Sequence, residues 1–419
     1  MKTVRCFLIA TGFVALQSSY VHGQRVEYKP VPAGFDFPAP EATLLNALQA
    51  GDEAKLRSHA WMVFAGLTQP ARPDDPASEA VWETWYRSDE VFSPGAVPQG
   101  VRTLQRKLSV PRQFQRAGGP QPQAVGESQL AFTLFNQEMK DHTRQNKLQL
   151  SATLRAINNG WTAQTSVVER KVKDYPRGAM SLKIVWMLIK KQGTTPLPIW
   201  DEQPRVATSP AQPPNTWKRV VVVDPSRDTI PAGEKKDVFL FGKQFPGSNV
   251  VPLKAFYHFA LSADQAAQIT DAAEGDFMAL TAMHYTTKEI PNWVWATFWW
   301  HDKPESGPYT KDRPDSTLLK GLWRNYLMDV SYDMDRPKES DNTPDAVFNP
   351  WLEARFVNGV NSNCMTCHQQ AVWPIRPPTP RQPSAFLPIT RGVAAVDDPM
   401  FKKSTKVDFL WSLLFEGNQ

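Results

Sequence analysis

Apolar residues recur at helical spacing near the start of the chain. Leucines and aromatic residues follow one another at intervals of three and four positions over residues 41–68, which is the period of an amphipathic helix. Asp52 lies within this stretch and is a typical N-cap residue. A further helical pattern covers residues 132–146. We therefore expect residues 24–174 to form a mainly helical and loop-rich N-terminal region.

From about residue 175 the pattern changes to that of β-strands. Runs rich in valine, isoleucine and aromatic residues alternate with turns rich in proline and glycine, which is typical of strands joined by short connections. These runs are 181–189, 217–223, 237–241, 253–261, 277–285 and 293–301. One helical pattern, at 262–273, interrupts them. The pattern predicts a β-rich domain over 175–345, with a mostly antiparallel sheet or sandwich against which the N-terminal helices pack.

The cysteines give the most informative chemistry of the sequence. Two of the three lie in Cys364-Met365-Thr366-Cys367-His368. The spacing Cys-x-x-Cys-His is typical of covalent haem attachment. Two intervening residues let both thiols reach one edge of the porphyrin, and the next histidine can bind the iron. A structural zinc site would need further cysteine or histidine ligands, and none lie nearby in the sequence. We expect one covalent haem c, attached to Cys364 and Cys367, with His368 as the proximal iron ligand.

The third cysteine, Cys6, belongs to a pattern typical of a secretory signal peptide at residues 1–23. Lys2 and Arg5 precede a short apolar run, and small residues precede a cleavage position before Gln24. The run is too short to span a membrane, and no stop-transfer segment follows it. We expect a periplasmic or secreted protein with no membrane span after cleavage. Its two remaining thiols would then both belong to the haem motif, which we define as residues 364–368.

The composition argues against some classes of binding partner but does not indicate a substrate. The net charge is +5, and it falls to +3 when Lys2 and Arg5 are removed with the signal peptide. This balance is too mild to indicate nucleic acid as a partner, and the chain has no polybasic run. The 15 tryptophans among 419 residues predict an aromatic core or an aromatic-lined pocket.

The last part of the chain has helical patterns on both sides of the haem motif. Asn349 and Pro350 are favourable at a helix start, and an apolar face follows up to Gly359. Residues 407–414 form another amphipathic pattern. This order of elements is found in small cytochromes c. We therefore expect residues 346–419 to form a small all-α haem domain of the cytochrome c type, in an α+β chain.

The second axial ligand of the iron decides the chemistry of a haem. Met400 is the first candidate, because it follows a proline on a loop before the last helical pattern, although an ordinary core or surface methionine would also suit this position. A thioether ligand would favour electron transfer. His284 and His301 are the alternatives, since each lies in an aromatic strand pattern. The other histidines of the mature chain are interpreted as core or surface residues: His59, His142 and His258.

Several blocks of the sequence resemble those of one family. They are Met283-His284-Tyr285 with Lys288 and 291–298, then 349–354 running into the haem motif, and the outer blocks 81–85 and 408–412. The family consists of large, exported bacterial monohaem cytochrome c-like proteins. The resemblance covers most of the mature chain and implies haem c and a periplasmic location, but no substrate. Trp299-Trp300-His301 departs from the family pattern, and this favours His284 over His301 as an iron ligand.

Three functions suit these predictions. The first is a periplasmic cytochrome that transfers electrons to a redox partner protein. The second is a haem-dependent oxidoreductase, peroxidase-like or oxidase-like, with a small-molecule substrate in a pocket between the β-rich domain and the haem. A di-haem peroxidase is excluded, because the sequence has no second haem motif. The third is a haem-based sensor, which no particular residue favours.

Overall fold

The structure is a computed structural model, and it describes residues 25–95, 100–104, 106, 108, 129–201, 212–307, 309–333, 346–354, 363–375 and 395–415. The predicted signal peptide at 1–23 lies outside the described residues. The described part is a mixed α and β fold with several sheets, in which antiparallel strand pairing dominates.

Two consecutive helices near the N-terminus, α1 (Glu41–Ala50) and α2 (Glu53–Leu67), confirm the helical prediction for 41–68. Gly51 separates them in the left-handed backbone region, with φ of 68°, which glycine adopts without steric cost. Asp52 caps α2 as expected, because its side chain accepts a hydrogen bond of 3.1 Å from the backbone N–H of Lys55.

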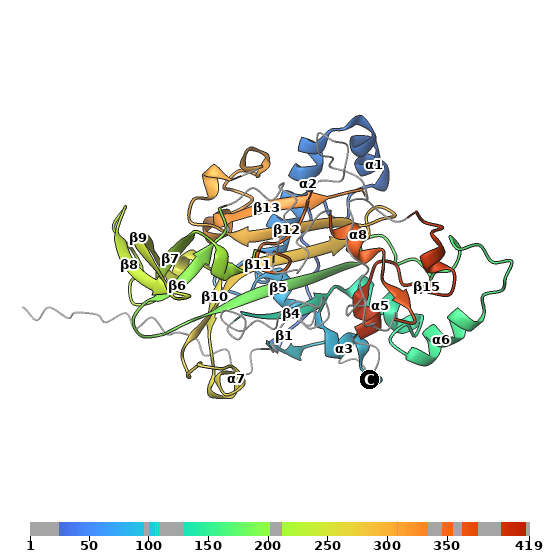
Figure 1. The fold of residues 1–419 in the computed structure, drawn as a ribbon, viewed down its shortest axis with the longest axis horizontal. Helices are drawn as coiled ribbons and strands as arrows, with labels where there is room; N and C mark the ends of the chain where they lie inside the picture. The colour runs from blue at the N-terminus through green and yellow to red at the C-terminus, as the bar shows by residue number, and fades with distance from the viewer. Residues whose placement is uncertain are drawn as a thin grey trace, which may run out of the picture.

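A large sheet forms the centre of the molecule (Figure 1). Its strand order is β13-β12-β11-β5-β4-β2, with β10 beside β11, and all neighbouring strands are antiparallel. The strands are β2 (Tyr86–Arg87), β4 (Gln129–Phe135), β5 (Met180–Ile189), β10 (His258–Ala260), β11 (Phe277–Thr287), β12 (Val294–Trp300) and β13 (Tyr326–Ser331). The sheet thus contains strands from both sides of residue 175, where we expected the β-rich domain to begin.

A smaller sheet lies at one end of the large one, at the left of Figure 1. Its order is β6-β7-β9-β8, and only the β7–β9 pair is parallel. The strands are β6 (Thr195–Ile199), β7 (Arg219–Asp224), β8 (Lys235–Leu240) and β9 (Lys243–Pro252). The runs predicted at 217–223 and 237–241 therefore form strands, but in a sheet separate from that of 277–285.

Two helical predictions were wrong in extent. The pattern at 132–146 begins with strand β4, and the helix α5 (Gln137–Gln145) starts only after Asn136, whose side chain caps it by accepting from Met139 N–H at 3.1 Å. The pattern at 262–273 gives only the four-residue α7 (Ala263–Ala266). In the first case, pairing of β4 with β5 overrides the local helical period.

The remaining elements are short. They are β1 (Arg25–Val26), β3 (Arg102–Thr103), α3 (Ser88–Phe92), α6 (Ser151–Asn159) and the 3-10 helices η1 (Val81–Thr84), η2 (Pro214–Thr216), η3 (Leu253–Ala255), η4 (Pro304–Ser306), η5 (Thr310–Asp312), η6 (Gly321–Asn325) and η7 (Pro399–Phe401). Strands β1 and β3 pair with each other.

One face of the large sheet is apolar and packs against α2. The rings of Phe64 and Phe298 are stacked, with centroids 4.0 Å apart, and Trp61 contacts Phe298 edge-on at 5.2 Å. Tyr285 donates a hydrogen bond to the carbonyl of Ala60 across the same interface. The N-terminal helices therefore pack on the sheet, as the sequence predicts.

The C-terminal segment lies against the opposite face and the end of the sheet. It consists of a turn at 349–354, α8 (Cys364–His368), the antiparallel pair β14 (Val372–Trp373) and β15 (Thr405–Lys406), and α9 (Trp411–Phe415). The described residues from 346 onward thus combine two five-residue helices with a two-stranded sheet, which differs from the all-α domain we expected. Where a helix was predicted after Asn349, residues 350–354 form a turn, and Asn349 Oδ1 accepts from the Trp351 N–H at 3.0 Å. The rest of the predicted helix, up to Gly359, lies outside the described residues.

Candidate haem-attachment site

Helix α8 places the reactive groups of the haem motif on one side. Cys364, Cys367 and His368 are spaced i, i+3 and i+4, so they share one face of the helix. These three side chains are partly exposed, whereas the intervening Met365 and Thr366 are buried. A single helical turn therefore directs both thiols and the imidazole the same way, which is the arrangement that attachment to one porphyrin requires.

Both thiols are free and neutral. Cys364 and Cys367 form no disulfide, and the Cys364 thiol lies 3.7 Å from the carbonyl of Val347. Desolvation by the surrounding protein raises the pKa of Cys364 well above its usual value and that of Cys367 to about 12. Both sulfurs are therefore held in the thiol form, which is the form that adds to a vinyl group.

The His368 imidazole is oriented by the segment before α9. Its Nδ1 lies 2.8 Å from the carbonyl oxygen of Phe409, and because a carbonyl only accepts, Nδ1 bears the proton and Nε2 has the lone pair. The ring centroid of Trp295 is 4.3 Å from that of His368. Desolvation lowers the pKa of His368 to about 4. A neutral imidazole with an available Nε2 meets the requirement of an iron ligand.

A row of polar residues crosses the sheet face on which this segment lies. Strand register places Lys183 of β5 opposite His284 of β11, His284 opposite Thr297 of β12, and Thr297 opposite Asp329 of β13. Residues paired across neighbouring strands point to the same face. This polar row contrasts with the apolar opposite face, where Phe298 packs on α2.

The turn at 349–354 binds this polar row. Glu353 Oε1 lies 3.1 Å from His284 Nε2, and Glu353 Oε2 accepts from the backbone N–H of Asn349 at 2.7 Å. The Asn349 side chain donates to the Thr297 hydroxyl and to the Phe298 carbonyl at 2.7 and 3.0 Å. Desolvation acts to raise the pKa of Glu353, but His284 and the Asn349 N–H outweigh it, so this pKa is lowered.

The His284–Glu353 pair lies within electrostatic range of the haem motif. After desolvation, the charge of Glu353 is the next cause of the raised pKa of both Cys364 and Cys367. The pKa of His368 depends, after desolvation and its bond to Phe409, on His284 and Glu353 with opposite signs. The structure therefore brings His284, one of the two histidine candidates for the second iron ligand, to the same region as His368.

The other candidates lie in different surroundings. Met400 is in η7, where its backbone N–H donates to Asp398 at 2.8 Å; among the described residues, no hydrogen bond or ring contact joins it to the haem motif. His301 is buried, with Nε2 2.9 Å from Asp201 and Nδ1 accepting from Lys303 N–H. The remaining histidines each have a hydrogen-bond partner: His59 with Glu289, His142 with Lys173, and His258 with Phe256.

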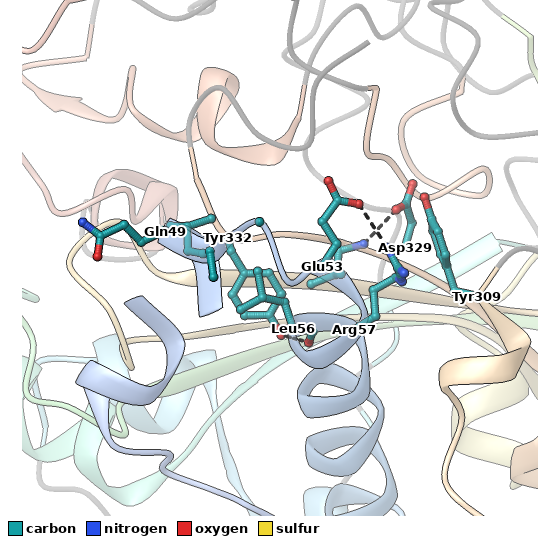
Figure 2. A pocket seen from close by; sticks show the side chains of 11 residues that line it. Gln49, Glu53, Leu56, Arg57, Tyr309, Asp329 and Tyr332 are labelled. Carbon is teal, nitrogen blue, oxygen red and sulfur yellow. Dashed lines mark hydrogen bonds and ion pairs between the residues drawn. The ribbon is translucent and has the colours of Figure 1, made fainter. Parts of the chain in front are cut away.

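A separate pocket of about 410 Å³ lies between the start of α2 and β13 (Figure 2). Arg57 borders it and is paired with Glu53 at 3.1 Å and with Asp312 at 2.6 Å, while its guanidinium lies 4.4 Å from the centre of the Tyr309 ring. These two carboxylates neutralise Arg57. Asp329 of the polar row also borders the pocket.

Sequence reasoning missed the roles of Glu353 and Phe409. Glu353 lies 69 positions from His284 in the chain, and no local pattern relates two residues so distant. Phe409 acts through its backbone carbonyl, which the side-chain sequence does not indicate. Alternation within 293–301 predicts that Trp295 and Thr297 share one face of a strand that could wall a haem, and β12 confirms the shared face.

No family model matches the sequence, and no curated protein and no solved structure matches the chain. Within the described part of the chain, no group of three or more histidine, cysteine, aspartate or glutamate side chains is arranged to hold a metal ion. A haem iron takes four ligands from its porphyrin and needs only one or two from the protein. Among the same residues, no helix combines the length and the apolar character needed to cross a bilayer.

Proposed function

We infer that the protein is an exported c-type cytochrome with one covalently attached haem, and that it transfers electrons to a redox partner in the periplasm. The observation that supports this most is the shared face of Cys364, Cys367 and His368 on one helical turn, with Nδ1 of His368 bound to a backbone carbonyl. Residues 346–419 would then be the haem-binding segment, and the rest of the chain would surround it.

The residues of the site have distinct roles in this proposal. Cys364 and Cys367 would hold the haem covalently: each S–H would add across one vinyl group, with sulfur bonding to one carbon and the hydrogen going to the neighbouring carbon. When bound, the haem supplies one-electron redox chemistry. His368 would hold the iron through Nε2; Phe409 fixes the orientation of the imidazole through its carbonyl, and the Trp295 ring lies beside it, with centroids 4.3 Å apart.

Covalent attachment is the property to test first. The protein is produced in a bacterium that exports it and attaches haem c, and covalent haem is measured by in-gel peroxidase staining and by the pyridine haemochrome spectrum. We expect one haem per chain, and none that survives denaturation when Cys364→Ser and Cys367→Ser are combined. Ser412→Ala, on the nearby α9, is a control that should retain the haem. A parent protein without covalent haem would refute the proposal.

A haem-dependent oxidoreductase is the second candidate, and the His284–Glu353 pair favours it. A histidine bound to a carboxylate at 3.1 Å on a polar sheet face can accept and return a proton, which a peroxidase-like or oxidase-like reaction needs and an electron carrier does not. The ferrous spectrum with carbon monoxide distinguishes the two. Rapid CO binding would indicate an open iron position and favour the enzyme, whereas no binding would favour the electron carrier.

A further inference from the structure

The turn that binds His368 has a backbone conformation that its residues disfavour. The N–H of Leu410 donates to the carbonyl of Val407 at 3.0 Å, and the two central residues, Asp408 and Phe409, have φ of 48° and 67°. Positive φ at both central positions is characteristic of a type I′ turn, in which glycine, asparagine and aspartate dominate. Aspartate tolerates this region, but a phenylalanine is strained there.

The side chain of Asp408 attaches this turn to two segments of the sheet domain, the β11–β12 connection and the residues before β5. One carboxylate oxygen, Oδ1, accepts from Lys288 Nζ at 2.7 Å and from Trp293 Nε1 at 3.1 Å. The other, Oδ2, accepts from the backbone N–H of Tyr175 at 3.1 Å. Asp408 and Lys288 are both only 8% exposed. Hydrogen bonds to a buried charge are among the stronger ones in proteins.

The cation of this pair is itself fixed in place. Lys288 Nζ also donates to the carbonyl of Pro291 at 2.8 Å and lies 5.2 Å from the centre of the Trp293 ring. The backbone of Lys288 bonds to that of Ala179 and Gly178, next to the start of β5. The anchor therefore connects the turn at 407–410 to the rigid end of the large sheet.

We propose that the Lys288–Asp408 ion pair is a positioning device for the iron ligand: it holds the 407–410 turn in its disfavoured conformation and so keeps the Phe409 carbonyl on Nδ1 of His368. Without the anchor, the backbone at Phe409 relaxes toward negative φ and its carbonyl turns away from the imidazole. Outer-shell partners of this kind set ring orientation and ligand basicity at metal sites. This inference rests on the proposed function as far as the haem is concerned.

Asp408→Asn is the decisive variant. Asparagine has nearly the same size and is at least as compatible with a type I′ turn, so the change removes the charge and one acceptor of the anchor while leaving the local turn preference intact. The matched control is Asp276→Asn. Asp276 is also buried, at 1% exposure, and its carboxylate binds Lys190 Nζ at 2.5 Å and two backbone N–H groups, of Lys191 and Ala273. It follows α7, which lies far from α8 in Figure 1.

Two measurements on the haem-loaded protein respond to the orientation of the His368 ring and not only to the stability of the fold. We expect Asp408→Asn to raise the midpoint potential, because an imidazole that loses its Nδ1–H···O bond donates less electron density to the iron. We also expect the Nδ1–H proton signal of His368 in the NMR spectrum to weaken through faster exchange. Asp276→Asn should change neither readout, although both variants lose stability.

A second variant covers the case in which Asp408→Asn does not fold. Trp293→Phe removes one donor to Asp408 and keeps an aromatic ring, so it should move both readouts in the same direction by a smaller amount. Adding Phe409→Gly to Asp408→Asn removes the penalty for positive φ and should restore part of the parent potential. A purely structural anchor would show no such restoration.

The outcomes separate this inference from the proposed function. If the parent binds haem but Asp408→Asn and Trp293→Phe leave the potential and the Nδ1–H signal unchanged, the positioning role is overturned and the cytochrome assignment stands. If Asp276→Asn shifts the potential equally, the role is also overturned. If the parent binds no haem, the proposed function fails, and ¹⁵N NMR of His368 in the haem-free chain decides the positioning role by whether Asp408→Asn moves the proton from Nδ1 to Nε2.

Discussion

Glu353 Oε1 lies 3.1 Å from Nε2 of His284, and through this contact a turn far along the chain is attached to the middle of the large sheet. The second oxygen of the same carboxylate accepts from the Asn349 N–H, so Glu353 closes the turn and binds the sheet at once. The polar row at Lys183, His284 and Thr297 offers hydrogen-bond partners that fix the position of the C-terminal segment. An apolar sheet face would not provide such partners.

Replacing Glu353 by glutamine should weaken this attachment. The change removes the charge that binds His284, and we expect a loss of about 1 kcal/mol in the free energy of unfolding at neutral pH, the size of one hydrogen bond. Because the folded pKa of Glu353 lies below its ordinary value of 4.5, its contribution is complete above that pH and is lost as pH falls through the folded pKa.

Urea unfolding at pH 7 and at pH 3.5 measures the effect. The difference between parent and Glu353→Gln should be largest at pH 7 and should shrink at pH 3.5. Glu234→Gln, which removes a partly exposed carboxylate paired with Arg227 on the small sheet, is a suitable control and should change stability little. A difference that grows on acidification would contradict the lowered pKa of Glu353.

His368 should make the haem-free protein sensitive to mild acid. Desolvation lowers its folded pKa from 6.5 to about 4, so the unfolded chain takes up a proton at a higher pH than the folded one. Stability from this residue is therefore complete above pH 6.5 and falls as the pH decreases toward 4, with a slope of at most about 1.4 kcal/mol per pH unit.

Comparison of the haem-free parent with His368→Gln isolates this contribution. Chemical denaturation at intervals between pH 7 and pH 5 should show a decline in the parent that is smaller in the variant. His301→Gln provides a comparison outside the haem motif. His301 is also buried, but both of its ring nitrogens have hydrogen-bond partners, Asp201 and the Lys303 N–H. Equal slopes for the parent and His368→Gln would rule out a depressed pKa at His368.

The stacked pair of Phe64 and Phe298 should dominate the packing of α2 on the sheet. Phe298 is fully buried, with its ring centroid 4.0 Å from that of Phe64, and truncation of such a residue to alanine costs about 3–5 kcal/mol. Phe239→Ala on β8 is the matched control, because that ring is 68% exposed and its removal should change stability by no more than about 0.5 kcal/mol. Thermal unfolding of both variants tests the contrast.

The elements with a strong local period were predictable from the sequence. Helices α1 and α2 and strands β5, β11 and β12 lie close to their predicted ranges, because their apolar positions repeat at one clear interval. The start of 132–146 was mistaken for helix, since Phe132, Leu134 and Phe135 suit either a strand or a helix, and the pairing of β4 with β5 decides the outcome. Local preference alone does not contain that information.

The candidate site was predictable only in part. The spacing of Cys364, Cys367 and His368 indicates attachment chemistry without knowledge of the fold. Which residue of β11 lies opposite Thr297 depends on strand register, and β11 also has an irregularity between Leu280 and Ala282 where it pairs with β5. The contacts of Glu353 with His284 and of Asp408 with Lys288 join residues 69 and 120 positions apart, and tertiary folding alone brings them together.

The second iron ligand gives the sharpest test between Met400 and His284. If Met400 binds the iron, Met400→Ala should abolish the weak ferric absorption band, at the red end of the visible spectrum, that marks methionine ligation. The same substitution should raise the affinity for carbon monoxide. If His284 binds the iron, His284→Ala should convert the low-spin haem to high spin and raise the affinity for carbon monoxide, and Met400→Ala should leave the spectrum unaltered.

The contact of His284 with Glu353 makes a further distinction possible. Glu353→Gln should alter the spectrum in the second case, because it removes the carboxylate that orients the imidazole, and should leave it unchanged in the first. Met62→Ala, on α2 and outside the haem motif, is the control for a methionine substitution. A parent spectrum that is high-spin and insensitive to both Met400→Ala and His284→Ala would exclude both ligands and favour an open iron position.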